Sequence, residues 1–562
     1  MNIKIILNNY KYNWKSIIIN DVSLSIKGNI FFENKYVEAV DLCKIFMDKI
    51  SQDSKRTSES ICPLIQNLEG DFAIIFQTPE ILLCVVDRLR TIPIYYRNNE
   101  LETVLSDCSD DLIDNSTIID QKNVLEFLHT GYVMGRETIY QNIFQLQAGE
   151  LLFYSKQIKK MEIWKYFYPT NKIIENVTEH MLLSQLDTVF NNVFLRLKQS
   201  TVDKGKFLVV PLSGGLDSRI IVALLKKYGI TDVICFSYGR LNNAESKISK
   251  KVADALGYEW IFIEYTNDKW KDIYSSEILK TYYKYASNST SLPHIQDFLA
   301  VKFIKENQLV PSNSTFVPGH TGDMISGGHI PGDLLNRNVY NNDLCAEEVI
   351  NYHFLNQPNK DSKQNRRLLK NKIRNYISEI IINNAESYAN GFEYFDFMER
   401  QSKFIINSVR TYEFFEYEWR LPLWDTQLIK FFKRVPLKYK IHQYLYKKYC
   451  LTYLFVDNLY KLKDIECTTN LNLAESNSEK MLMAISGSLA DSKFVLDYKN
   501  KLIDVKENVR AKIVENEIYK FHPLAYYGFI EESRFLSEYH LRKNVNSFLT
   551  ADYVSNLYQE KN

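Results

Sequence analysis

Residues 206–264 alternate between short apolar runs and amphipathic segments. The runs KFLVVPL, DVICFSYG and EWIFIEYT are typical of buried strands, and the segments between them have helical spacing and end at Gly229 and Gly257. This alternation predicts a parallel sheet with helices on its faces. Ligands of such sheets bind at the carboxyl ends of the strands, so we expect a functional site there.

The turn between the first strand and its helix reads SGGLDS, Ser213–Ser218. Its two glycines let a ligand approach the backbone, and the N-terminus of the next helix presents N–H groups to an anion. The carboxylate of Asp217 would repel a phosphate group unless a cation lay between the two. Asp217 therefore predicts a bound Mg²⁺ ion. The lysine of a Walker loop is absent, and so is the spacing of a dinucleotide fingerprint. A plain glycine-rich turn is the structural alternative.

SGGLDS resembles the pyrophosphate loop of the ATP pyrophosphatases. In this form it is similar to asparagine synthetase and its relatives, the β-lactam synthetases and lasso-peptide cyclases. That family activates a carboxylate with ATP as an acyl-adenylate, releases pyrophosphate and lets an amine attack. The resemblance implies an ATP site that comprises Ser213, Gly214, Gly215, Leu216, Asp217, Ser218, Gly319, and Phe236 and Ser237 on the strand beside the adenine.

FVPGHTGDMISGGH, residues 316–329, is similar to the SGEGSDEVFGGY loop of the same family. The resemblance implies that Asp323 is a second magnesium ligand facing Asp217, an arrangement that holds a leaving pyrophosphate. His320 stands where asparagine synthetase has Glu and β-lactam synthetases have Tyr. A histidine can deprotonate an attacking amine, or it can only contact substrate. His320 and Met324, which replaces Glu, argue against the ammonia–aspartyl pair of a standard asparagine synthetase.

Two later segments carry further candidates. EYEWRLPLWD, residues 416–425, resembles GVEARVPFLD of the family, which makes Glu418 a candidate base or substrate contact. A structural role is the alternative for both Glu418 and Arg420, and Arg420 is equally compatible with an ion pair. The resemblance also implies a late lysine that stabilises the pyrophosphate, for which Lys461 and Lys463 are the nearest candidates and Lys463 is preferred. Most surface lysines are merely solvated, which is the structural alternative.

The N-terminal part is rich in predicted strands. DFAIIFQ, EILLCVVD and IPIYYR are expected to be consecutive antiparallel strands. LEGDFAIIF and VDRLRTIPIYY resemble the glutaminase domain of asparagine synthetase. The resemblance implies an N-terminal-nucleophile αββα sandwich over residues 1–168 and an ATP-binding synthetase domain over residues 175–562 with a largely helical C-terminal part. The expected fold class is therefore α/β and α+β.

The catalytic residue of the glutaminase domain is absent from this sequence. The family uses a cysteine directly after the initiator Met, whose own amino group acts as base, and Asn2 stands there. The NGEIYN glutamine-binding stretch is also absent. We predict that this part does not hydrolyse glutamine and instead covers one side of the synthetase site.

Composition excludes several other classes. A net charge of +1 gives no support for a nucleic-acid partner, which disfavours a tRNA-modifying enzyme with the same loop. No apolar run is long enough for a membrane span, and there is no signal peptide pattern. The eight cysteines form no CxxC pair, which argues against a zinc site or a disulfide framework. We therefore expect a cytoplasmic protein.

The sequence predicts an ATP- and Mg²⁺-dependent ligase that forms an adenylate and then an amide bond, without glutamine hydrolysis in cis. Its expected partners are a small-molecule or peptide carboxylate and ammonia or another amine. An intramolecular cyclase of the β-lactam synthetase or lasso-peptide type is one alternative, and a non-catalytic scaffold is another. Whether the chain forms a homodimer stays open.

Overall fold

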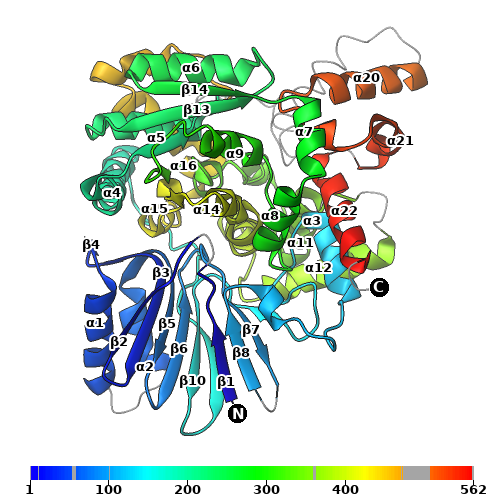
Figure 1. The fold of residues 1–562 in the computed structure, drawn as a ribbon. Coiled ribbons are helices and arrows are strands. Elements are labelled where there is room, and N and C mark those ends of the chain that lie inside the picture. Colours follow the sequence, from blue (N-terminus) through cyan, green and yellow to red (C-terminus); the bar gives the residue numbers. More distant parts are fainter. Residues whose placement is uncertain are drawn as a thin grey trace.

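The computed structural model describes residues 2–9, 12–52, 58–99, 102–357, 362–469, 471, 507–542 and 544–559. The described residues form three sheets with the strand orders β1-β8-β7-β9, β11-β10-β6-β5-β3-β2 (with β4 paired to β3) and β14-β13-β12-β15-β16. The first two sheets lie together in the N-terminal part, and the third lies in the part that follows (Figure 1).

The N-terminal part is a sandwich of two sheets. The larger sheet is antiparallel and consists of β2 (Lys15–Ile19), β3 (Val22–Phe32), β4 (Lys35–Tyr36), β5 (Leu68–Gln77), β6 (Ile81–Val86), β10 (Glu150–Ser155) and β11 (Lys160–Lys165). The smaller sheet consists of β1 (Asn2–Ile6), β7 (Tyr95–Asn98), β8 (Glu102–Ser106) and β9 (Phe144–Gln145), with β1 parallel to β8.

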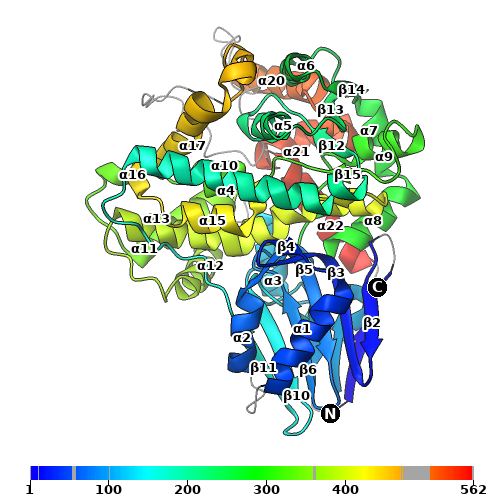
Figure 2. The same ribbon diagram turned by 90° about the vertical axis from the view of Figure 1, so that its left-hand side faces the viewer.

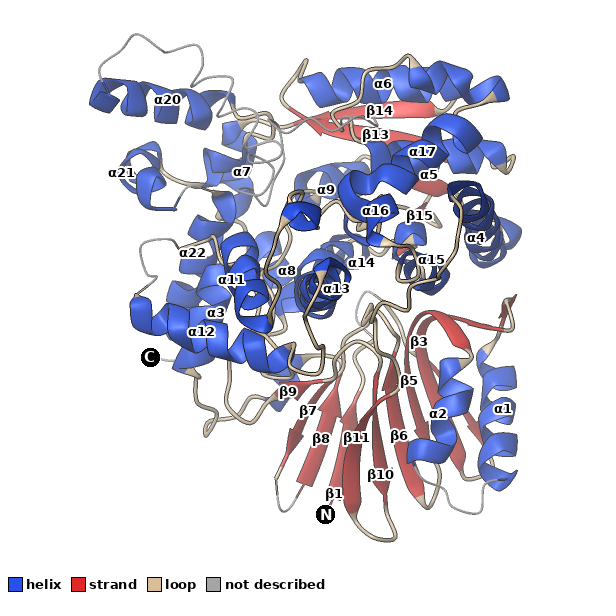
Figure 3. Ribbon diagram, turned by 180° about the vertical axis from the view of Figure 1, so that it is seen from behind, coloured by secondary structure: helices blue, strands red, loops and turns tan. Residues whose placement is uncertain are grey.

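Both faces of the larger sheet are covered, which explains the unbroken apolar run of β5. Successive residues of a strand point to opposite faces. Ala73 and Ile75 therefore join a buried cluster that includes Leu105 of the smaller sheet, whereas Ile74 and Phe76 join a separate cluster beneath α1 (Ala39–Gln52) and α2 (Ser58–Gln66). Figure 3 shows these two helices on the outer face of the larger sheet.

The expectation of three consecutive antiparallel strands is wrong for the third. β5 and β6 form an antiparallel pair, but β7 leaves for the smaller sheet and pairs with β8 and β9. The turn after β6 causes this change of direction. The buried carboxylate of Asp87 accepts hydrogen bonds from the backbone N–H groups of Leu89 and Thr91 in the turn and of Phe72 on β5, which fix the turn at the end of the larger sheet.

The parallel sheet has the predicted order of elements. It contains β12 (Leu208–Pro211), β13 (Val233–Gly239), β14 (Glu259–Glu264), β15 (Thr315–Phe316) and β16 (Glu418–Trp419), and all its pairs are parallel. The helices α5 (Leu216–Lys227) and α6 (Ala244–Leu256) connect β12, β13 and β14. The predicted fold class, a mixed α/β and α+β chain with an N-terminal two-sheet sandwich and a parallel-sheet part, is confirmed.

The remainder is mostly helical, as predicted. Its helices include α3 (Gln121–Thr130), α4 (Glu179–Ser200), α7 (Asn267–Tyr274), α8 (Glu277–Ser287), α9 (Phe298–Glu306), α10 (Gly322–Ile325), α11 (Asn342–His353), α12 (Lys363–Tyr376), α13 (Ala385–Phe395), α14 (Arg410–Phe414), α15 (Thr426–Phe432), α16 (Leu437–Lys440), α17 (Tyr444–Tyr449), α20 (Glu507–Phe521), α21 (Glu532–Arg542) and α22 (Val545–Gln559). None of the described helices is both long and apolar enough to cross a membrane.

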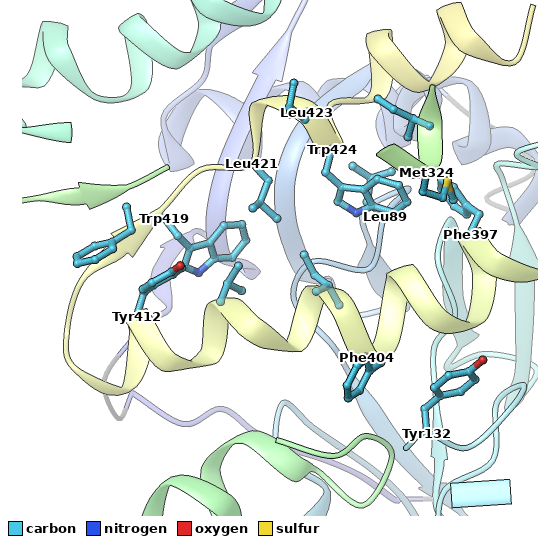
Figure 4. Close-up of a cluster of buried hydrophobic side chains, with 14 of the residues drawn as sticks. Leu89, Tyr132, Met324, Phe397, Phe404, Tyr412, Trp419, Leu421, Leu423 and Trp424 are labelled. Carbon is cyan, nitrogen blue, oxygen red and sulfur yellow. The ribbon is translucent and has the colours of Figure 1, made fainter. Parts of the chain in front are cut away.

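One continuous helical stretch runs through the centre of the molecule. It begins as α13, becomes a π-helix at Asp396–Ile405, tightens to a 3₁₀ turn at Ile406–Val409 and ends as α14. Figure 4 shows its buried side chains, with Phe397 and Phe404 projecting from different sides. π-Helical turns are rare and often mark functional sites.

The sandwich packs tightly against the helical part. The Arg196 guanidinium on α4 donates to Asn34 Oδ1 at 3.0 Å, and Arg420 donates to Asn29 of β3 at 2.9 Å. A cavity of about 40 Å³ lies at this boundary, lined by Asp71, Arg196 and Arg420 among others. α4 and α15 contact each other above the sandwich (Figure 2). The predicted division at residues 168–175 falls between β11 and α4.

Candidate active site

The SGGLDS turn connects β12 to α5 at the carboxyl end of the parallel sheet. The Ser218 hydroxyl accepts a hydrogen bond from the Ser213 backbone N–H at 3.1 Å, and the two serine hydroxyls lie 3.0 Å apart. Gly215 caps the helix in an extended conformation, and no side chain caps the first turn. The N-terminus of α5 is therefore available to an anion, as predicted for this loop.

A second loop, after β15, lies directly against the first. The backbone N–H of Asp323 donates to Oδ2 of Asp217 at 3.1 Å. A Cβ on Gly319 would lie 2.7 Å from the Ser218 nitrogen, and a Cβ on Gly322 would lie 2.6 Å from Asp217 Oδ1. The structure therefore brings together both predicted loops and both predicted carboxylates, and glycine is required where they touch.

The electrostatics of the two carboxylates differ. Burial and the negative charge of Asp323 raise the pKa of Asp217 to about 8, although Tyr446 donates to its Oδ1 at 3.0 Å. Burial also raises the pKa of Asp323, but the charge and hydrogen bond of His329 outweigh it and hold that pKa below its ordinary value. Asp217 is thus a half-buried carboxyl group whose charged form is disfavoured by its surroundings.

His329 bridges two carboxylates. Its Nε2 lies 3.1 Å from Asp323 Oδ2, and its Nδ1 contacts Asp396 at the start of the π-helix. Burial lowers the pKa of His329, but Tyr352, Asp323 and Asp396 raise it well above its ordinary value. His329 is therefore an imidazolium that fixes Asp323 relative to the central helix.

This arrangement fits a magnesium ion. Mg²⁺ binds through one or two carboxylates and completes its shell with water and substrate phosphates. Asp217 and Asp323 are two such carboxylates beside a helix N-terminus, and a cation would compensate the charge of Asp217. The described residues contain no cluster of three or more His, Cys, Asp or Glu suited to a metal. An ion here would therefore depend on phosphate oxygens for the rest of its shell.

His320 lies in the second loop, beside the central helix. Its Nε2 is 2.9 Å from the Ser408 hydroxyl, and that hydroxyl donates to the Ile405 carbonyl at 2.7 Å. A serine hydroxyl has a single proton, so it accepts a hydrogen bond from His320 Nε2–H. Burial lowers the pKa of His320, so the ring is neutral near pH 7. The free lone pair is then on Nδ1, for which the described residues provide no hydrogen-bond donor.

Phe236 and Ser237 lie on β13 beside the SGGLDS turn. The Leu212 backbone N–H donates to the Phe236 carbonyl at 2.8 Å, and the Phe236 ring packs edge-on against Phe316. Ser237 is buried. The backbone of this strand flanks the loop as expected, while the Phe236 ring is part of the hydrophobic core.

Glu418 does not join the other candidates. It pairs in register with Thr315, which pairs with Leu208, the first residue of β12. The SGGLDS turn follows the other end of β12, about 10 Å further along the strand. Glu418 forms ion pairs with Lys206 and Arg420, and the latter contact is 3.1 Å long. The geometry therefore corresponds to the structural alternative, because Glu418 lies at the amino edge of the sheet.

Lys463 is exposed at the end of a 3₁₀ helix, Asp457–Lys463, and Lys461 is exposed as well. The backbone that follows crosses the SGGLDS turn: the Thr468 N–H donates to the Gly214 carbonyl at 3.0 Å. The buried Arg219 of α5 holds this segment by donating to the carbonyls of Leu462, Ile465 and Glu466. Lys463 thus belongs to the segment that covers the loop, but its side chain faces solvent.

Sequence reasoning missed the residues that support the site. They are Tyr446, which donates to Asp217, Arg219, His329, Asp396, Ser408 and Thr468. They come from five separate stretches of the chain. Of these residues, only His329 could have been found from a local pattern, because it is the last residue of the second loop, FVPGHTGDMISGGH.

A parallel sheet whose central strand leads into a glycine-rich loop, with a second loop supplying a facing carboxylate, is an α/β arrangement that can accept an anionic ligand. Residues 200–459, which contain both loops, match the asparagine synthase family model. This match marks residues 200–459 as an asparagine synthase domain, and such a domain supports ATP-dependent amide-bond synthesis in general.

The comparisons with curated sequences and with solved structures do not extend this assignment. No curated protein sequence matches the chain. A solved structure of the allosteric regulatory enzyme of purine biosynthesis is 11% identical with a TM-score of 0.19, covering 44% of this chain and 70% of that one. Glutamine phosphoribosylpyrophosphate amidotransferase from B. subtilis, complexed with ADP and GMP, is 10% identical with a TM-score of 0.16, covering 54% of this chain and 62% of that one.

Proposed function

We propose that the chain activates a carboxylate substrate with ATP and then joins it to an amine as an amide. In the first step a carboxylate oxygen attacks the α-phosphorus, and pyrophosphate leaves. In the second step the amine attacks the acyl carbon, and AMP leaves with the bonding electrons. The contact between Asp217 and Asp323 at the SGGLDS turn is the observation that carries the proposal.

The two loops supply the groups for the first step. The N-terminus of α5 and the serine hydroxyls would bind phosphate oxygens, and Gly319 and Gly322 allow the loops to close on each other. Asp217 and Asp323 would hold Mg²⁺, which neutralises charge that develops on pyrophosphate. Electrostatic stabilisation of this leaving group is expected to be the largest catalytic contribution.

His320 is the proposed base of the second step. Its neutral ring, with Nε2–H directed to Ser408, leaves Nδ1 free to accept the proton that the attacking amine loses. Glu418 is not part of this proposal, because it lies at the other edge of the sheet. Lys463 remains a proposed pyrophosphate contact that would have to turn from solvent toward the covered loop.

The N-terminal sandwich is proposed to be a cover that does not hydrolyse glutamine. Hydrolysis by this fold needs a reactive thiolate. In the described sandwich Cys43, Cys62 and Cys84 are buried and Cys108 is half-buried. Burial raises the pKa of Cys62 to about 11 and that of Cys108 to about 12, so both thiols stay protonated.

Pyrophosphate release from MgATP across a panel of carboxylates, each with ammonia or amines, tests the proposed function. Release that depends on one carboxylate and vanishes in Asp217→Ala and Asp323→Ala supports it. Asp254→Ala, which removes an exposed carboxylate on α6, is the control and should keep wild-type release. If wild-type protein does not bind MgATP at all, the enzyme proposal fails and the scaffold alternative stands.

A further inference from the structure

One face of the central helix is directed at the candidate site. Asp396, Arg400, Phe404 and Ser408 follow one another at intervals of four residues, close to one helical turn. Three of the four contact the loops around the site. Asp396 binds His329, Phe404 packs on His294 with ring centroids 5.8 Å apart, and Ser408 contacts His320.

Arg400 is the member of this face without a partner. It lies between Asp396 and Phe404 and is half-buried, yet among the described residues it forms no hydrogen bond or ion pair. Its charge nevertheless acts on both ends of the site. Burial lowers the pKa of His294 to about 4, and Arg400 contributes to this decrease; Arg400 also helps to hold the pKa of Asp323 down.

The nearby carboxylates form their hydrogen bonds with another group and not with Arg400. The His329 ring already bonds to both Asp323 and Asp396. Glu399, the preceding residue, turns to the sandwich and binds Lys403 in a buried ion pair. Arg400 therefore adds a second positive charge near these carboxylates without a hydrogen bond to either of them, and it lies on the central helix next to the proposed reaction site.

A second polar group nearby also lacks a partner. The Tyr132 hydroxyl is buried, and no described residue bonds to it. Burial and Glu399 raise its pKa well above the ordinary value, while Arg400 opposes them, so Tyr132 remains a neutral donor close to Arg400. A guanidinium and a hydroxyl donor without partners form a suitable receptor for an oxyanion.

We propose that Arg400 binds an oxyanionic group of the substrate other than the carboxylate that is activated, either a second carboxylate or a phosphate ester. This inference rests on the proposed function and names the residue that would select the substrate. The substrate side is favoured over the phosphates of ATP, because Phe404 and Ser408, the members of this face that follow Arg400, contact His294 and His320.

Calorimetric titration of the full chain tests the proposal with simple probes. Succinate and inorganic phosphate are the anionic probes, succinamide is the uncharged analogue, and MgATP reports the nucleotide site. In wild-type protein we expect succinate or phosphate to bind and succinamide not to bind. Binding of succinate would identify the substrate group at Arg400 as a carboxylate, and binding of phosphate would identify it as a phosphate ester. Arg400→Gln should weaken that binding roughly 10- to 100-fold, the loss expected for charged hydrogen bonds, with MgATP affinity unchanged.

Two variants guard against a folding artefact. Arg400→Lys keeps the charge but not the planar fork, so its affinity should fall between those of wild type and Arg400→Gln. Arg374→Gln removes an exposed arginine of α12 and should bind as wild type does. Thermal melting must show that all three variants fold.

The proposal is overturned if neither anion binds wild-type protein, if Arg400→Gln binds the anion as well as wild type does, or if it loses MgATP to the same degree. A failure of this proposal can be distinguished from a failure of the proposed function. Anion binding through Arg400 without pyrophosphate release with any acid would refute the ligase but leave the anion site. Pyrophosphate release that Arg400→Gln leaves unchanged would support the ligase and refute the anion site at Arg400.

Discussion

The backbone N–H of Asp323 donates a 3.1 Å hydrogen bond to the carboxylate of Asp217, although the two residues are separated by 106 positions in the chain. This bond joins the loops that follow β12 and β15, two neighbouring parallel strands. It places both carboxylates at one point of the sheet edge, and the energetics of that contact can be tested directly.

Gly322→Ala is predicted to separate the two loops. Its Cβ would lie 2.6 Å from Asp217 Oδ1 and 2.8 Å from Leu423, so one of the loops must move. We expect a loss of about 1–3 kcal/mol in the free energy of unfolding and loss of Mg²⁺-dependent ATP binding. Calorimetry and chemical denaturation measure the two effects.

Gly229→Asn is the control for that substitution. Gly229 has a φ of +69° after α5 with open space around it, and asparagine tolerates this conformation. It should keep ATP binding. Wild-type ATP affinity in Gly322→Ala would show that the loops do not need to touch.

Arg219→Met is predicted to release the segment that covers the SGGLDS turn. The substitution removes donors to three carbonyl groups between Leu462 and Glu466, while its unbranched chain keeps the apolar packing. The amide of Thr468, bonded to the Gly214 carbonyl, should then exchange with solvent faster. Hydrogen exchange of this amide is the measurement, and MgATP affinity should fall with it.

Arg240→Met provides the comparison, because Arg240 donates to the His522 carbonyl away from the loop. It should leave the Thr468 amide protected. Equal exchange rates at Thr468 in Arg219→Met and wild type would show that other contacts hold the segment.

His320→Asn is predicted to divide the two steps of the reaction. Asparagine can still contact Ser408 but cannot take a proton from the amine, so amide formation should fall by a factor on the order of 10² to 10⁴. Exchange of labelled pyrophosphate into ATP, which reports only adenylation, should change by less than about tenfold. An equal loss in both assays would contradict the assignment of His320 as base.

Glu418→Gln is the matched test of the rejected candidate. It weakens ion pairs with Lys206 and Arg420 at the amino edge of the sheet, so we expect reduced stability with both activities retained. A selective loss of amide formation in this variant would return Glu418 to the mechanism.

His353 predicts a specific pH dependence of stability. It is buried against Phe392 and Phe395, both ring nitrogens lack hydrogen-bond partners in the described residues, and burial lowers its pKa to about 3. The unfolded chain binds the proton more readily, so the contribution is complete above pH 6.5 and is lost as the pH falls toward 3. At pH 5 this residue alone should cost about 2 kcal/mol relative to pH 7.5.

His353→Phe should remove this part of the pH dependence, because it keeps the ring stacking without a titrating group. Urea unfolding at pH 7.5 and pH 5 measures it, with His180→Phe, an exposed site on α4, as the control. The interpretation fails if the stability of His353→Phe falls with acidification as steeply as that of wild type.

The elements whose signals are local could be predicted from the sequence alone. The parallel sheet, the helices α5 and α6 and the anion loop were predictable, because strand runs, helical spacing and the SGGLDS turn lie within one short stretch. The second loop was found as well, since its glycines and Asp323 are contiguous.

Which of these residues meet follows from the fold and not from a local pattern. β15 and β16 reach the sheet after long helical connections, and their register sends Asp323 to Asp217 but leaves Glu418 at the opposite edge. The π-helical turns of the central helix place Arg400 beside the site, a consequence of packing that no local pattern encodes. Local propensity selects elements, whereas strand order, register and helix phase depend on contacts between residues far apart in the chain.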